Sequence, residues 1–67
     1  MDKTLIKGLM VLERIARSES AVRVTEVAAN LGLTKSNAHR VLKTLEFAGY
    51  VKQDPRTKEF DSSLKLW

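Results

Sequence analysis

The chain has 67 residues, no cysteine and a formal net charge of +4. At this length it forms at most one domain, which buries only about 60% of the surface of its unfolded chain and has no room for a deep catalytic cleft. Without cysteine the chain can form neither a disulfide nor a thiolate zinc site. It also lacks the apolar runs typical of a signal peptide or a membrane-spanning helix, so we expect a cytoplasmic, non-enzymatic protein that uses no cofactor, metal or membrane.

The first predicted helix begins with Thr4 as its N-cap and carries apolar residues at helical spacing. Its expected buried face comprises Leu5, Leu9, Leu12, Ile15 and Ala16. Gly8 lies inside this helix, where glycine is less favourable than alanine for helix formation by about 1 kcal/mol. It is therefore either tolerated or marks the close approach of another backbone.

A short strand is expected over residues 21–24, followed by a second helix with Thr25 as its N-cap. This helix ends at Gly32, because glycine adopts the left-handed conformation that follows many helices. Thr34 then caps a third helix that extends to Ala48. The turn between the two helices is therefore roughly three to four residues long, which is the spacing of a helix-turn-helix motif.

The third helix separates an apolar face from a polar one. Its predicted inner face contains Ala38, Val41, Leu42 and Leu45. Ser36, Arg40 and Lys43 lie opposite, while Asn37 and Thr44 flank one side of this outward face and His39 flanks the other. Phe47 also points outward, and it covers either the wing or a missing part of the chain.

A β-hairpin is predicted after Gly49, with strands over residues 50–53 and 59–60 joined by a turn from Asp54 to Lys58. The fold class is therefore mainly α with a small β-hairpin, a winged helix-turn-helix with a three-helix core. We expect residues 1–61 to form this domain. Residues 62–67 would begin a linker helix toward an absent C-terminal domain that binds an effector.

The charge surplus lies in one stretch, since residues 34–58 carry six basic and two acidic side chains and the rest of the chain is neutral. Such a basic surface is typical of nucleic-acid binding, and an α-helix fits the major groove of DNA. Arg40 could pair with guanine, Asn37 with adenine, and Ser36 with a base or a phosphate. The candidate DNA-binding residues are Thr25, Thr34, Lys35, Ser36, Asn37, His39, Arg40, Lys43, Thr44, Arg56 and Lys58.

The run Leu33-Thr34-Lys35-Ser36-Asn37-Ala38-His39-Arg40-Val41-Leu42-Lys43-Thr44-Leu45, followed by Gly49-Tyr50-Val51, resembles the IclR (isocitrate lyase regulator) family of bacterial and archaeal transcription factors. Looser matches are Val11-Leu12-Glu13, Thr25-Glu26-Val27-Ala28 and Asp54-Pro55. The resemblance implies binding of double-stranded DNA, at a palindromic operator, by a homodimer or a dimer of dimers. It also implies that a small-molecule effector acts only through the missing C-terminal domain. The family often has glycine in the wing where this chain has Lys58, and a left-handed conformation costs a non-glycine residue roughly 1 to 2 kcal/mol, so the type of turn at Lys58 stays open at this point.

A winged helix can also serve as a protein interaction module, and the fold alone does not decide between the two uses. Clustered basic residues on the outward face favour DNA. A catalytic role is not indicated, because Ser36 and His39 have no third group to orient them.

Overall fold

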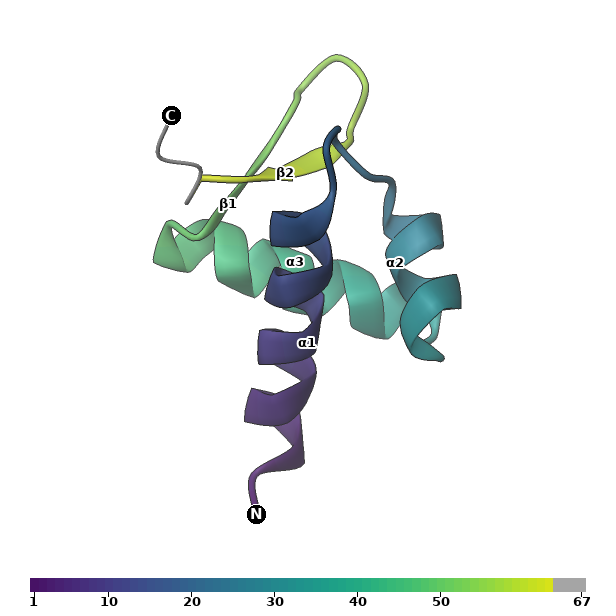
Figure 1. The fold of residues 1–67 in the computed structure, drawn as a ribbon, viewed down its shortest axis with the longest axis vertical. Helices are drawn as coiled ribbons and strands as arrows, with labels where there is room; N and C mark the ends of the chain where they lie inside the picture. The colour runs from purple at the N-terminus through teal and green to yellow at the C-terminus, as the bar shows by residue number, and fades with distance from the viewer. Residues whose placement is uncertain (64–67) are drawn as a thin grey trace.

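The computed structural model describes residues 1–63, which form three helices followed by a two-stranded antiparallel hairpin (Figure 1). The elements are α1 (Lys3–Arg17), α2 (Val24–Leu31), α3 (Lys35–Ala48), β1 (Val51–Gln53) and β2 (Phe60–Ser62). The predicted fold class, a three-helix core with a wing, is confirmed. No helix in the described part of the chain has both the length and the apolar character to cross a membrane.

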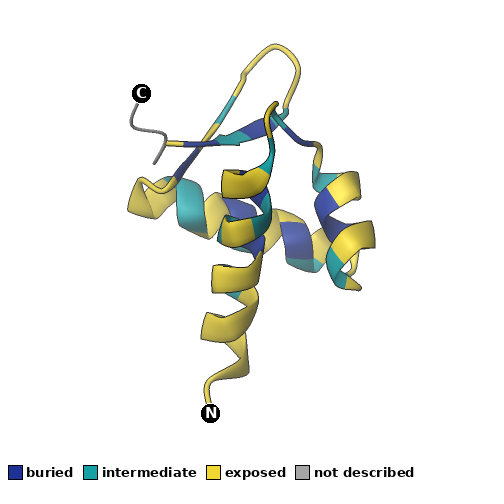
Figure 2. Ribbon diagram, viewed as in Figure 1, coloured by how far each residue is buried: buried dark blue, intermediate teal, exposed yellow. Residues whose placement is uncertain are grey.

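Helix α1 differs from the prediction at its start and on its buried face. Its N-cap is Asp2, whose carboxylate accepts a hydrogen bond of 3.1 Å from the Leu5 amide, and Thr4 lies inside the helix. Val11, which was not predicted to be buried, lies in the core with Ile15. Leu5 and Leu9 are 60% and 57% exposed, because the N-terminal half of α1 extends beyond the other elements (Figure 2).

The two remaining residues of that predicted face differ from each other in burial. Leu12 is half-buried against the core, as expected, whereas Ala16 is exposed in the last turn of the helix. Only the stretch of α1 from Val11 to Ile15 therefore contributes to the core.

Helix α2 begins two residues earlier than predicted, so Thr25 is not its cap but lies in its first turn. The N-cap position is Arg23, whose backbone amide donates to the Glu26 carboxylate at 3.2 Å. The predicted strand over residues 21–24 is reduced to a single bridge at Val22, which exchanges hydrogen bonds of 2.8 and 2.7 Å with the backbone of Phe60. Because Val24 already belongs to α2, no longer strand forms.

The turn between α2 and α3 agrees with the prediction. Gly32 has a φ of 67°, and the following Leu33 amide donates to the Ala28 carbonyl at 2.9 Å. The Thr34 hydroxyl accepts from the Asn37 amide at 3.1 Å and caps α3. These local contacts fix the direction in which α3 leaves the turn.

Strands β1 and β2 pair antiparallel, with Lys52 opposite Asp61 and Gln53 opposite Phe60. Ser62, expected to precede a linker helix, lies in β2 opposite Val51. The rest of that expected helix, residues 64–67, lies outside the described residues.

One core holds all the elements together. Its buried apolar residues are Val11, Ile15, Val22, Val27, Ala28, Ala38, Leu42, Val51 and Phe60. The predicted inner face of α3 is confirmed, since Ala38 and Leu42 are buried and Val41 and Leu45 pack against the core. The outward face of α3 therefore lies on the side of the helix away from the core.

Lys58 in the wing turn has a φ of 66°, the only positive φ at a non-glycine residue in the described chain. A side chain with a Cβ costs roughly 1 to 2 kcal/mol in this conformation. Glycine removes that cost but has more freedom in the unfolded chain, so Lys58→Gly should stabilise the domain by about 0.5 to 1 kcal/mol. Thermal unfolding should show a midpoint raised by a few degrees. Lys58→Ala, which keeps the Cβ, should show no such gain; an equal gain would contradict a backbone origin.

Candidate nucleic-acid interface

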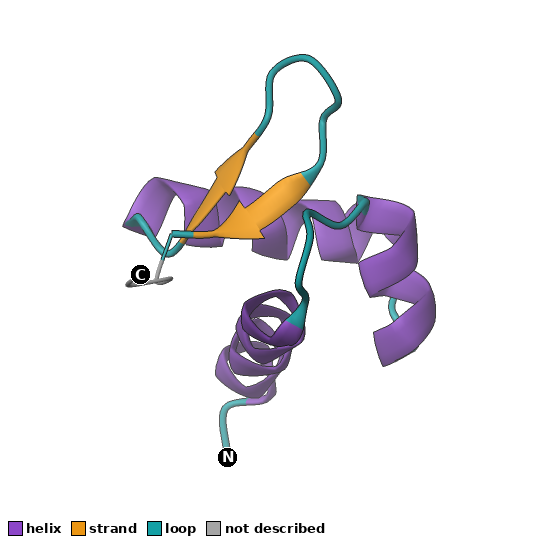
Figure 3. Cartoon of the chain, turned by 45° about the horizontal axis from the view of Figure 1, so that its top comes forward, coloured by secondary structure: helices purple, strands orange, loops and turns teal. Residues whose placement is uncertain are grey.

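The outward face of α3 consists of side chains that follow one another at helical spacing on the side opposite the core. Ser36, Arg40, Lys43 and Phe47 lie within about 60° of one another around the helix axis, at 100° per residue. All four are exposed. Among residues 1–63 the guanidinium of Arg40 has no hydrogen-bond or ion-pair partner, so it is available to a ligand. Figure 3 shows the wing rising beside this helix.

The N-terminus of α3 presents donors to the same side. The backbone amides of Lys35 and Ser36 precede the first intrahelical bond, while the Asn37 amide is taken by the cap. Free amides and the positive end of the helix dipole favour an anion such as a phosphate. Lys35 and Thr34 are exposed at this end, and Asn37 is half-buried.

Lys43 differs from Arg40 because it already has partners. Its ammonium lies 2.7 Å from the Glu46 carboxylate and donates to Oε1 of Gln53 at 3.3 Å. Thr44 is engaged too, since its hydroxyl donates to the Arg40 carbonyl at 2.9 Å. A phosphate approaching Lys43 would have to compete with Glu46.

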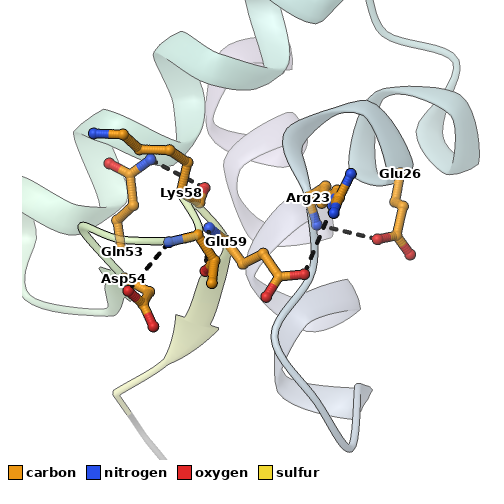
Figure 4. A network of polar contacts seen from close by, with 7 residues as sticks. Arg23, Glu26, Gln53, Asp54, Lys58 and Glu59 are labelled. Carbon is orange, nitrogen blue, oxygen red and sulfur yellow. Dashed lines mark hydrogen bonds and ion pairs between the residues drawn. The ribbon is translucent and has the colours of Figure 1, made fainter.

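The wing turn is organised by Asp54 (Figure 4). Its carboxylate accepts from the amides of Arg56 at 2.7 Å and Thr57 at 3.3 Å, and its backbone carbonyl accepts from the Lys58 amide at 2.8 Å. The basic side chains of Arg56 and Lys58 are exposed on this turn. The predicted Asp-Pro turn is thus confirmed.

Polar contacts join the wing to two helices. The Gln53 side chain receives the Lys43 hydrogen bond and donates to the Lys58 carbonyl at 3.1 Å, which connects α3 to the turn. On the other side, Glu59 lies 3.7 Å from Arg23 at the start of α2 (Figure 4). The sequence analysis missed the role of Gln53, and no sequence signal could have indicated it, because its partners meet only in the folded chain.

The structure brings most predicted site residues onto α3 and the wing. Thr25 lies apart, exposed in the first turn of α2, and His39 is exposed on α3. Phe47 does not cover the wing, since it is 94% exposed. In residues 1–63 no group of histidine, aspartate and glutamate side chains could hold a metal ion.

Residues 4–55 match the IclR helix-turn-helix domain family. Over 51 residues, 76% of this chain, the sequence is 43% identical to the transcriptional repressor IclR of Escherichia coli K12. It is also 30% identical over 60 residues, 90% of the chain, to the HTH-type transcriptional regulator XynR of the same organism. The aligned parts make up 19% and 24% of these relatives, so the chain spans about a fifth to a quarter of their length.

The fold is similar to solved structures of the same group. An IclR family transcriptional regulator from Brucella abortus superposes with a TM-score of 0.88 and 28% identity, covering 96% of this chain and 25% of that one. The predicted three helices and wing therefore recur in a regulator that is about four times longer.

Proposed function

The chain belongs to the IclR helix-turn-helix domain family, and on this basis we propose that it binds double-stranded DNA in a sequence-specific way as part of a transcription regulator. Helix α3 enters the major groove and the wing contacts the flanking backbone. The observation that carries the proposal is the exposed outward face of α3, where Arg40 has no partner in the described chain and where, with the wing, the whole charge surplus lies.

Each group on this surface has a chemical role in the proposal. Arg40 pairs with guanine, Asn37 with adenine, and Ser36 with a base or phosphate. Phosphates are held by the side chains of Thr25, Thr34, Lys35, His39, Lys43, Thr44, Arg56 and Lys58, together with the free amides at the start of α3. The engaged hydroxyl of Thr44 can serve only as an acceptor unless it leaves the Arg40 carbonyl.

We further propose that two copies act together, because specific recognition by such domains usually spans two half-sites. The exposed Leu5 and Leu9 on α1 offer an apolar surface for a second copy. We assign effector binding to a C-terminal domain of the complete regulator. We place the protein in the cytoplasm, where DNA is accessible. Selection of bound duplexes by the complete regulator should return palindromic half-sites; a site without them would contradict the dimer.

A mobility shift with random duplex at about 50 and 200 mM salt tests DNA binding directly. Neutralising several phosphates releases counterions, so affinity should fall steeply with salt. A protein interaction module would show no binding at either concentration. That result would overturn the proposed function.

Lys43→Ala should weaken binding to all duplex sequences alike and reduce the slope of log affinity against log salt by about one, as expected for one lost phosphate contact. Glu46→Gln is the matched variant, because it removes the acid that holds Lys43 at 2.7 Å. It should raise affinity for all duplexes. Binding unchanged in both variants would show that Lys43 serves only to hold Gln53 and the wing.

A further inference from the structure

Phe47 is the most exposed large apolar residue in the described chain apart from Met1, with 94% of its surface accessible. By contrast, Phe60, the chain's other phenylalanine, is 1% exposed. A phenylalanine that is this exposed contributes very little to folding, since its stabilising effect comes from burial. The ring of Phe47 is therefore available for a contact outside the folded domain.

The ring lies on the same line of α3 as the polar residues of the outward face. Phe47 follows Arg40 by seven residues, which places it within about 20° of the same direction and about 10.5 Å further along the helix. The buried residues Ala38 and Leu42 lie on the opposite side. Phe47 is thus part of the surface that the proposed function sets against DNA.

The chemistry of the major groove limits what this ring can contact. The base edges there present hydrogen-bond donors and acceptors, and their one apolar group is the 5-methyl of thymine. A separation of 10.5 Å corresponds to about three base-pair steps of 3.4 Å.

Resting on the proposed function, we infer that Phe47 reads a thymine by packing its ring against the 5-methyl group, about three base pairs from the guanine paired with Arg40. The contact makes Phe47 a specificity-determining residue. It adds an apolar preference to a face whose other outward residues are polar or charged.

Removal of a single methyl group from the DNA tests this contact. The tightest duplex selected from random sequences is taken as the probe, and each thymine is replaced in turn by deoxyuridine, which differs only in lacking that methyl. One replacement should weaken binding of the unaltered protein about fourfold, the value of one buried methyl or methylene group. Phe47→Ala should bind the thymine duplex at least fourfold more weakly and should be indifferent to that replacement.

Two further variants control for general effects of changing an apolar side chain. Phe47→Leu keeps an apolar contact and should retain most of the thymine preference. Met10→Ala, which shortens a side chain that is 44% exposed on α1, should bind both duplexes as the unaltered protein does.

The inference is overturned if the selected duplex has no thymine at the expected spacing or if no deoxyuridine replacement matters. It also fails if Phe47→Ala still binds the deoxyuridine duplex about fourfold more weakly than the thymine duplex. It fails as well if this variant changes only the sedimentation coefficient, which would place Phe47 between copies of the chain. In each of these cases the unaltered protein still binds duplex DNA through Arg40. A protein that binds no duplex at all would instead overturn the proposed function as well.

Discussion

Phe60→Ala is expected to destabilise the domain by about 3 to 5 kcal/mol, the usual cost of removing a buried phenylalanine ring. The ring is 1% exposed and belongs to the core that joins the hairpin to the helices. A domain of this size has roughly 3 to 10 kcal/mol of total stability. Urea unfolding followed by circular dichroism should therefore show a midpoint close to zero denaturant.

Phe60→Leu and Leu9→Ala serve as controls for this prediction. Leucine keeps most of the volume and should cost less than about 1.5 kcal/mol, so the variant remains measurable if the alanine variant is unfolded. Leu9 is 57% exposed, and its replacement should change the unfolding free energy by less than about 1 kcal/mol. Equal losses from Leu9→Ala and Phe60→Ala would mean that the N-terminal half of α1 is buried after all.

Arg40→Ala is expected to weaken binding to the preferred duplex by about 1 to 3 kcal/mol and to relax the preference at one base pair. The reason is that a bidentate pair between a guanidinium and guanine is lost, and no other residue of α3 can replace its geometry. Affinity for duplexes that differ at each position of the selected site, measured at one salt concentration, locates that base pair.

Arg40→Lys is the matched variant, because it keeps the charge without the planar fork of donors. It should retain the salt dependence of binding and lose most of the base preference. If Arg40→Ala weakened binding to every sequence by the same factor, Arg40 would hold a phosphate and the assignment of the base contact would be wrong. Free energies of unfolding should match the unaltered protein in both variants, since the side chain is exposed.

The centre of the fold was predictable because its signals are local. Gly32 and Gly49 adopt left-handed conformations with φ of 67° and 91°, and Thr34 caps the helix that follows it. Each depends on a side chain or backbone within a few residues. The boundaries of α3, its buried face and the turn at Asp54 therefore followed from the sequence, as did the outward position of most candidate site residues.

Other features depended on where distant elements meet. Helix α1 has apolar residues over a wide arc, and Val11 rather than Leu9 is buried because α2, α3 and β2 pack on the side of the helix that carries Val11 and Ile15. The link from Lys43 through Gln53 to Lys58 joins residues up to 15 positions apart, and its members are common surface residues with no pattern of their own. Short-range chemistry thus determined α3 and its caps, whereas tertiary packing decided which face of α1 is buried and how the wing is held.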